Sequence, residues 1–195
     1  MNHTGTEPGM RLSRWVGMCV LLALATVAVQ KTQAGQAHEL LWMCYPAAGL
    51  LCVGLLFRQS LLAATGGLFY LAIGLPYWFI DLVATRTTTV GSVALHLLAP
   101  IAGIFHIRQA GLQTTAKWLV LAVYLSLLPI SRWLTPPALN INLAFGPYQA
   151  HQGAIPLWAS YLCNTLFGLV LLLAVERLLR RVLVSHSSGR KTGPS

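Results

Sequence analysis

Cysteine, histidine and aspartate side chains lie near the ends of long apolar segments, where they could act together in catalysis. Cys44 lies four residues into the segment 40–57, His96 lies six residues into the segment 90–107, and Asp81 comes near the end of a third segment. A thiol beside an imidazole forms a nucleophile that can accept an acyl group, and a carboxylate can orient the imidazole. We therefore predict Cys44 as nucleophile, His96 as base and Asp81 as the orienting group.

A metal or haem site is the alternative chemistry for the same polar residues. His38, Glu39, His96 and His151 could converge on one ion, because imidazole is a ligand for zinc, copper and iron. No pair has a known ligand spacing such as His-Glu-x-x-His, and only His96 and His106 share an apolar segment. The sequence leaves the identity of any cofactor or metal unknown.

Further polar residues belong to the second half of the chain. Arg132 comes near the end of an apolar segment, and Asn140 and Asn142 lie in the connection that follows it. Tyr161 and Asn164 are three residues apart, which places them on one face of a helix. We predict that these five residues contribute to a polar site on the same side of the molecule as the catalytic candidates.

Six apolar segments have the length of membrane-spanning helices, for which about 20 residues are needed. The segments are 14–30, 40–57, 61–83, 90–107, 117–134 and 156–175. Their apolar residues are continuous and do not alternate with polar ones, which excludes a membrane β-barrel. The sequence predicts an all-α, polytopic transmembrane bundle of about six helices. This single domain covers 11–184, with a flexible N-terminus at 1–10 and a basic tail at 185–195.

Composition and charge agree with a membrane protein. Hydrophobic residues make up 56% of the chain and charged residues 9%, against about 25% charged in soluble domains. This excludes a soluble globule and a disordered chain. Basic residues lie between apolar segments and not on a polar background, so the net charge of +9 does not indicate nucleic acid. The expected partners are membrane lipids, and other membrane protein subunits remain an alternative.

The distribution of lysine and arginine predicts the orientation in the membrane. With the N-terminus inside, ten of the 13 basic residues face the cytoplasm, and only Lys31, Arg86 and Arg132 face outwards. Such a bias is typical of cytoplasmic loops. We expect a multi-pass protein of the inner membrane with both termini cytoplasmic. The first segment also resembles a secretory signal peptide, whose cleavage would leave five helices.

The connection 135–155 is long for a loop without secondary structure, which favours a functional role. We predict that it forms an outer lid or a re-entrant cap. Four prolines lie within predicted helices, namely Pro46, Pro76, Pro100 and Pro129. We expect each proline to bend its helix and so to open the bundle.

The order of short motifs resembles the YwaF-like family of small integral membrane proteins over about Leu40–Gly146. The motifs are Leu-Leu-Trp-Met-Cys-Tyr-Pro from Leu40, Ile-Asp-Leu around Asp81, and Ala-Leu-His-Leu-Leu around His96. One branch of the family is regarded as a Cys/His acyltransferase acting on phospholipid. The resemblance implies this activity for Cys44 and His96. Trp42-Met43 stands where the family has a histidine before the cysteine, and Phe79-Ile80 replaces its Thr-Pro.

The residues and the resemblance together favour a lipid-modifying acyl transfer enzyme. An accessory subunit of a membrane complex and a metal-handling or haem-handling protein remain alternatives. A transporter is less favoured, since many secondary transporters contain internal repeats and none is visible here.

The predicted topology can be tested by labelling single cysteines on a cysteine-free background. A cysteine at position 150 should react with an impermeant maleimide from the outer face, and one at position 190 should react only from the inner face. The opposite labelling pattern would reverse the orientation and remove the candidate site from the outer half of the bilayer.

Overall fold

A computed structural model describes residues 7–85, 88–146 and 155–188, and every regular element in these ranges is helical. The helices are α1 (Glu7–Gln33), α2 (Cys44–Leu56), α3 (Ser60–Phe69), α4 (Leu75–Thr85), α5 (Val90–Ala110), α6 (Ala116–Leu134) and α7 (Leu157–Ser188). The π-helical segment η2 (Tyr70–Gly74) joins α3 to α4, so that these three elements form one continuous rod. The described chain therefore contains six helical rods, which confirms the predicted all-α bundle.

Five of the rods are long and apolar enough to cross a membrane. They include Leu12–Gln33, Ser60–Val83, Val90–Ala110, Ala116–Leu134 and Leu157–Val182. Their outer surfaces carry many exposed apolar side chains, such as Leu22 on α1 and Val170 on α7. These features identify a multi-pass membrane protein.

Helix α2 is shorter than the predicted segment 40–57. It begins only at Cys44, because the chain before it forms the 3-10 turn η1 (Ala37–Leu41). Its 13 residues extend about 20 Å, less than the roughly 30 Å of a hydrocarbon core. Pro46 lies in the first turn of α2, where no helical amide donor is needed, so the helix accommodates this proline without losing a backbone hydrogen bond.

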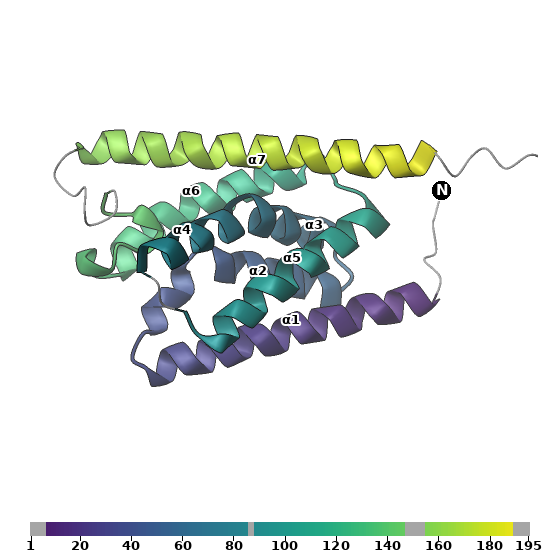
Figure 1. The fold of residues 1–195 in the computed structure, drawn as a ribbon, viewed down its shortest axis with the longest axis horizontal. Coiled ribbons are helices and arrows are strands. Elements are labelled where there is room, and N and C mark those ends of the chain that lie inside the picture. The colour runs from purple at the N-terminus through teal and green to yellow at the C-terminus, as the bar shows by residue number, and fades with distance from the viewer. Residues whose placement is uncertain (1–6, 86–87, 147–154, 189–195) are drawn as a thin grey trace, which may run out of the picture.

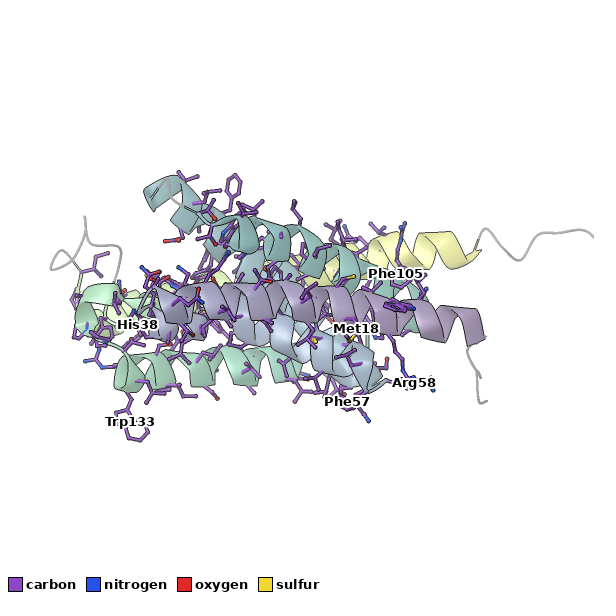
Figure 2. All side chains as sticks on the ribbon, turned by 90° about the horizontal axis from the view of Figure 1, so that it is seen from below. Met18, His38, Phe57, Arg58, Phe105 and Trp133 are labelled. Atoms are coloured by element: carbon purple, nitrogen blue, oxygen red, sulfur yellow. The ribbon has the colours of Figure 1, made fainter. Side chains whose placement is uncertain are left out.

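The rods run up and down, and the start of α1 and the end of α7 lie at the same end of the bundle (Figure 1). Helices α1 and α7 form opposite edges, with α2 and α3 between them. Figure 2 shows His38 and Trp133 at one end of the molecule and Phe57 and Arg58 at the other. We name the end with His38 and Trp133 the distal end, and the end with Phe57 and Arg58 the proximal end.

Helix α7 is longer than the predicted segment 156–175 and continues to Ser188. The buried Glu176 side chain explains part of the extension, since it pairs with Lys117 of α6 at 3.4 Å and with Arg180 at 2.9 Å. Arg180 also donates to the carbonyl of Leu112. These contacts hold α7 against α6 and the α5–α6 connection at the proximal end.

Helices α2 and α3 are packed so closely that glycine is required between them. An ideal Cβ on Gly66 would lie 2.2 Å from the backbone nitrogen of Leu51 and 2.7 Å from the carbonyl oxygen of Ala47. Gly67 and Gly103 face each other in the same way where α3 crosses α5. Small residues commonly allow such contacts between membrane helices, where the hydrophobic effect does not drive association.

Gly66→Ala should destabilise the protein by about 3 kcal/mol or more, because the backbone of α2 must move to admit a methyl group. Gly49→Ala is the matched control, since no atom lies within 4 Å of its ideal Cβ. This control should be neutral or should stabilise by up to about 1 kcal/mol through helix propensity. Unfolding in mixed micelles, followed by circular dichroism, measures both. Equal stabilities would contradict the close packing of α2 and α3.

Candidate functional site

The π-helical segment η2 changes the direction of the side chains that follow it. Pro76 lies just after this segment and cannot donate a hydrogen bond to the preceding turn, so the α-helical pattern is interrupted here. Gly74 then lies against the first residue of α2, with its ideal Cβ only 3.2 Å from the Cα of Cys44. Single π turns often occur at functional sites. The segment brings α4 beside the N-terminus of α2.

A cavity of about 430 Å³ opens at the distal end, between α1, η1, α2, α4 and α5. Its size is typical of sites for small ligands. The polar and aromatic residues that line it are Lys31, Gln36, Glu39, Trp42, Cys44, Tyr45, Tyr77, Trp78, Asp81, Thr88, Thr89 and Ser92.

Two of the three predicted catalytic residues line this cavity. Cys44 is buried at the start of α2, and Asp81 lies on α4, so the fold brings together two residues far apart in the chain. Glu39 of the predicted metal set also lines the cavity, where its carboxylate pairs with the Lys31 ammonium.

His96 does not line the cavity but is buried behind its wall. The imidazole is 2% exposed and stacks on the Trp78 ring, with 4.2 Å between centroids and 17° between planes. Its Nδ1 lies 2.7 Å from the Ser92 carbonyl oxygen. Because a carbonyl only accepts, Nδ1 carries the proton of the neutral ring and Nε2 keeps a lone pair. Among the described residues, Nε2 has no hydrogen-bond partner.

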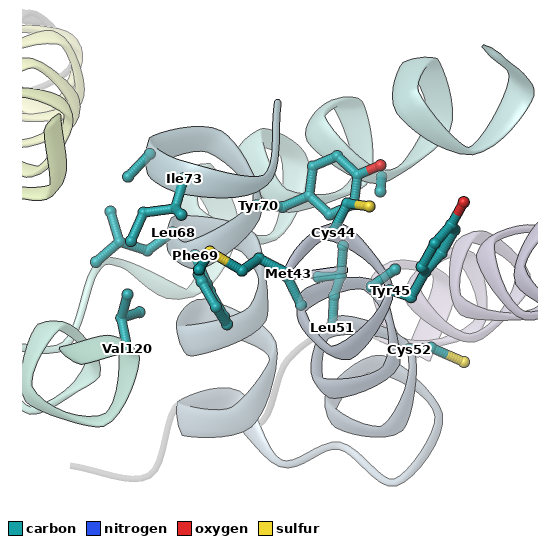
Figure 3. Close-up of a cluster of buried hydrophobic side chains, with 14 of the residues drawn as sticks. Met43, Cys44, Tyr45, Leu51, Cys52, Leu68, Phe69, Tyr70, Ile73 and Val120 are labelled. Atoms are coloured by element: carbon teal, nitrogen blue, oxygen red, sulfur yellow. The ribbon is translucent and has the colours of Figure 1, made fainter. Parts of the chain in front are cut away.

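Among the hydrogen bonds of the described residues, none joins Cys44 to His96. The Trp78 and Tyr70 rings contact the imidazole instead, the latter with 5.5 Å between centroids. Figure 3 shows the Cys44 thiol beside the Tyr70 ring in the buried cluster. Neither Tyr70 nor Trp78 was among the predicted site residues. The spacing of Tyr70, Gly74, Trp78 and Asp81 at four-residue and three-residue steps was a signal for one helical face.

The six tryptophans of the chain divide into two groups by their exposure. Four of them are highly exposed on the outer surface of the bundle, namely Trp15, Trp118, Trp133 and Trp158. Such exposure is typical of an aromatic belt at the membrane interface. Trp42 and Trp78 are partly buried and line the cavity.

The described part of the connection after α6, residues 135–146, folds back into the distal end, and we call it the cap. Residues 147–154 of the predicted lid or re-entrant cap lie outside the described residues. Asn142 is fully buried within the turn η4 (Ile141–Leu143). Its Nδ2 donates to the carbonyl of Leu41 and to Ser131 Oγ, both at 2.8 Å. Its Oδ1 accepts from the Met43 amide at 2.9 Å. One side chain thus connects the cap to α6 and to the chain entering α2.

Asn164 continues this network from α7. Its Nδ2 donates to the carbonyl of Asn142 at 3.3 Å, and its Oδ1 accepts from the Tyr77 hydroxyl. The Tyr124 hydroxyl donates to the Asn164 backbone carbonyl at 2.7 Å. Asn164 therefore faces the interior, and links the cap to α4 and α6.

The remaining predicted polar residues surround the cap. Arg132 Nη1 donates to the carbonyl of Ala144 at 3.2 Å, and the Tyr161 hydroxyl donates to the same oxygen. Asn140 bonds within the cap, to the carbonyl of Gly146 and to the amide of Phe145. These residues hold the cap in place and do not line the cavity.

The predicted metal set is only partly described. His38 lies half-buried in η1, and its Nε2 has no hydrogen-bond partner among the described residues. His151 lies outside the described residues. Within the described ranges, no three histidine, cysteine, aspartate or glutamate side chains form a group suited to a metal ion. The metal interpretation of His38, Glu39, His96 and His151 remains an untested hypothesis.

No family model, curated protein or solved structure matches this chain. The resemblance to YwaF-like proteins therefore rests on the motifs alone and stays untested.

Asn142→Ala should destabilise the bundle by about 3 kcal/mol, because the buried Met43 amide and Leu41 carbonyl lose their partner. The exposed Ser126 hydroxyl bonds only within its own helix among the described contacts, so Ser126→Ala is a near-neutral control. Thermal unfolding measures the difference. Asn142→Gly tolerates the positive φ of 57° but lacks the side chain. Full stability of this glycine variant would contradict the role of the amide.

Proposed function

We propose that this chain is a lipid-modifying acyl transfer enzyme of the inner membrane, with its site in the distal cavity. Cys44 acts as the nucleophile, His96 as the base, and Asp81 as a polar group of the same site. The observation that carries the proposal is the shared cavity of Cys44 and Asp81, with the lone pair of His96 Nε2 buried close behind its wall.

The orientation that we propose places the distal end at the outer face and both termini in the cytoplasm. Arg58 lies at the proximal end, and Lys117 and Arg180 bind Glu176 there. The distal end carries Lys31 and Arg132 among the described residues. Basic residues are more frequent on the cytoplasmic side of membrane proteins, which supports this orientation.

The proposed reaction has two steps. The Cys44 thiol transfers its proton to His96 Nε2 while its sulfur attacks the ester carbonyl of an acyl lipid. The C–S bond forms and the C–O bond breaks, and the leaving alkoxide takes the proton from His96. A second alcohol or amine then attacks the thioester, transfers its proton through His96, and restores the thiol.

The surroundings of the cavity suit a lipid donor. The outer surface near the cavity-lining residues carries exposed apolar side chains. They are Phe79, Ile80 and Val83 of α4 and Leu97 of α5. An acyl chain can lie against this surface while its ester reaches Cys44. His96 stacks on Trp78 and has no hydrogen bond to Cys44 among the described residues, so the proposal requires a side-chain rearrangement when the donor binds.

The thioester can be trapped with a phospholipid whose acyl chain carries an alkyne. We expect hydroxylamine-sensitive labelling of the full chain in lipid nanodiscs, lost in Cys44→Ala. His96→Gln should slow labelling by about 100-fold or more, the usual contribution of a general base.

Cys52→Ala is the matched control for this experiment. Cys52 is buried on the same helix but does not line the cavity, so its removal should leave labelling unchanged. The exposed Cys19 and Cys163 are replaced by serine in all variants. Labelling that persists without Cys44, or that never occurs in the folded protein, would overturn the acyl transfer proposal.

A further inference from the structure

Two buried polar atoms without a hydrogen-bond partner belong to rings that contact each other. Among the described residues, the buried side-chain atoms without a partner are His38 Nε2, Thr65 Oγ1, Tyr70 Oη and His96 Nε2. The Tyr70 and His96 rings lie 5.5 Å apart between centroids and are tilted by 55°. A buried polar atom without a partner costs free energy, and native proteins contain few of them. Two such atoms in one ring contact therefore need an explanation.

The two atoms are chemically complementary. The Tyr70 hydroxyl can donate a hydrogen bond, and no group among the described residues accepts it. His96 Nε2 keeps a lone pair, because the proton of the neutral ring lies on Nδ1, next to the Ser92 carbonyl. A shift of the two rings within their contact can therefore join them by an O–H···N hydrogen bond.

Tyr70 also lies beside the proposed nucleophile. Figure 3 shows the Cys44 thiol next to the Tyr70 ring, and both residues belong to the same buried cluster. Gly74, one turn after Tyr70, lies against the same residue, with its ideal Cβ 3.2 Å from the Cα of Cys44. Tyr70 thus has both the Cys44 thiol and the His96 imidazole as neighbours, whereas no hydrogen bond among the described residues joins these two groups directly.

We propose that the Tyr70 hydroxyl relays the proton of the Cys44 thiol to His96. The hydroxyl oxygen accepts the thiol proton while its own proton passes to Nε2. The S–H bond breaks, an N–H bond forms, and the phenol is restored beside a thiolate and an imidazolium. The inference rests on the proposed function, since it takes Cys44 as nucleophile and His96 as base, and it adds the group that connects them.

The relay predicts opposite effects of Tyr70→Phe on stability and on chemistry. The hydroxyl has no partner in the resting structure, so its removal should raise the midpoint of thermal unfolding by about 2 °C or more. Tyr124→Phe is the matched control, because Tyr124 is also fully buried but donates to the Asn164 carbonyl at 2.7 Å. This control should lower the midpoint. A stable Tyr70→Phe protein excludes misfolding as the cause of any lost reactivity.

The chemical effect is measured with methyl methanethiosulfonate, a small thiol reagent that requires no acyl lipid. The Cys44 sulfur forms a disulfide with the methylthio group of the reagent, and methanesulfinate leaves. The full chain is used in a maltoside detergent, with its other three cysteines replaced, namely Cys19, Cys52 and Cys163. The rate of modification at several pH values then reports on the Cys44 thiol alone.

The pH profile separates a relay from a packing role of Tyr70. A thiol without a base reacts only as thiolate, so its rate rises about tenfold for each pH unit below its pKa. With the relay, the wild-type rate should change by less than about twofold between pH 7 and pH 8. Tyr70→Phe and His96→Gln should each react about tenfold or more slowly at pH 7 and regain the steep rise. The double variant should be no slower than either single variant, because the two groups act as one unit.

Two outcomes overturn the relay: a wild-type rate that rises tenfold between pH 7 and pH 8, or a Tyr70→Phe protein with the wild-type rate and profile. Tyr124→Phe should keep the wild-type profile, since Tyr124 does not line the cavity.

The lipid-labelling experiment distinguishes failure of the relay from failure of acyl transfer. Thioester formation at the wild-type rate in Tyr70→Phe would reject the relay and keep acyl transfer. An equal loss of thiol reactivity in Tyr70→Phe and His96→Gln, without thioester formation in the wild type, would reject acyl transfer and keep the relay.

Discussion

The buried side chain of Asn142 satisfies the backbone groups on which the distal end depends. Where the chain leaves η1 and enters α2, the amide of Met43 and the carbonyl of Leu41 have no helical partner, and Asn142 bonds to both. In a membrane there is no water to replace these bonds. Asn142 makes these bonds with a positive φ, which asparagine tolerates better than most residues. The break before α2, the cap and the position of Cys44 therefore depend on one another.

The cavity arises from a second constraint, the close packing of the helices in the middle of the bundle. Gly66 and Gly67 let α3 lie directly against α2 and α5, so the space there is filled by backbone. The π turn at Tyr70–Gly74 then interrupts the helix, and α4 continues as the wall of the cavity. The close packing of the centre leaves the described cavity at the distal end, where Cys44 and Asp81 line it and where we propose that the chemistry occurs.

The two ends of the bundle are stabilised by different interactions. At the proximal end, Glu176 pairs with Lys117 and Arg180 at the cytoplasmic side that we propose. At the distal end, neutral amides and hydroxyls of Asn142, Asn164 and Tyr77 form most of the network. Neutral groups cost less than charges to bury in a membrane, and fixed hydrogen bonds keep the cap and α7 rigid around the cavity.

Hydrophobic runs and charge counts were sufficient to predict the helices, because a membrane requires about 20 apolar residues for each span. The predicted spans 61–83, 90–107 and 117–134 agree closely with the observed helices, since each consists of one apolar run. The short α2 and the long α7 could not be predicted, because the bonds of Asn142 and Glu176 that set them join residues far apart in the chain.

The distal location of Asp81 followed from the order of the helices. Only the tertiary structure decided that Asp81 shares a cavity with Cys44 while His96 packs behind Trp78. The physical reason is that the π turn at Tyr70–Gly74 changes the direction of the side chains that follow it but leaves the hydropathy of the run unchanged.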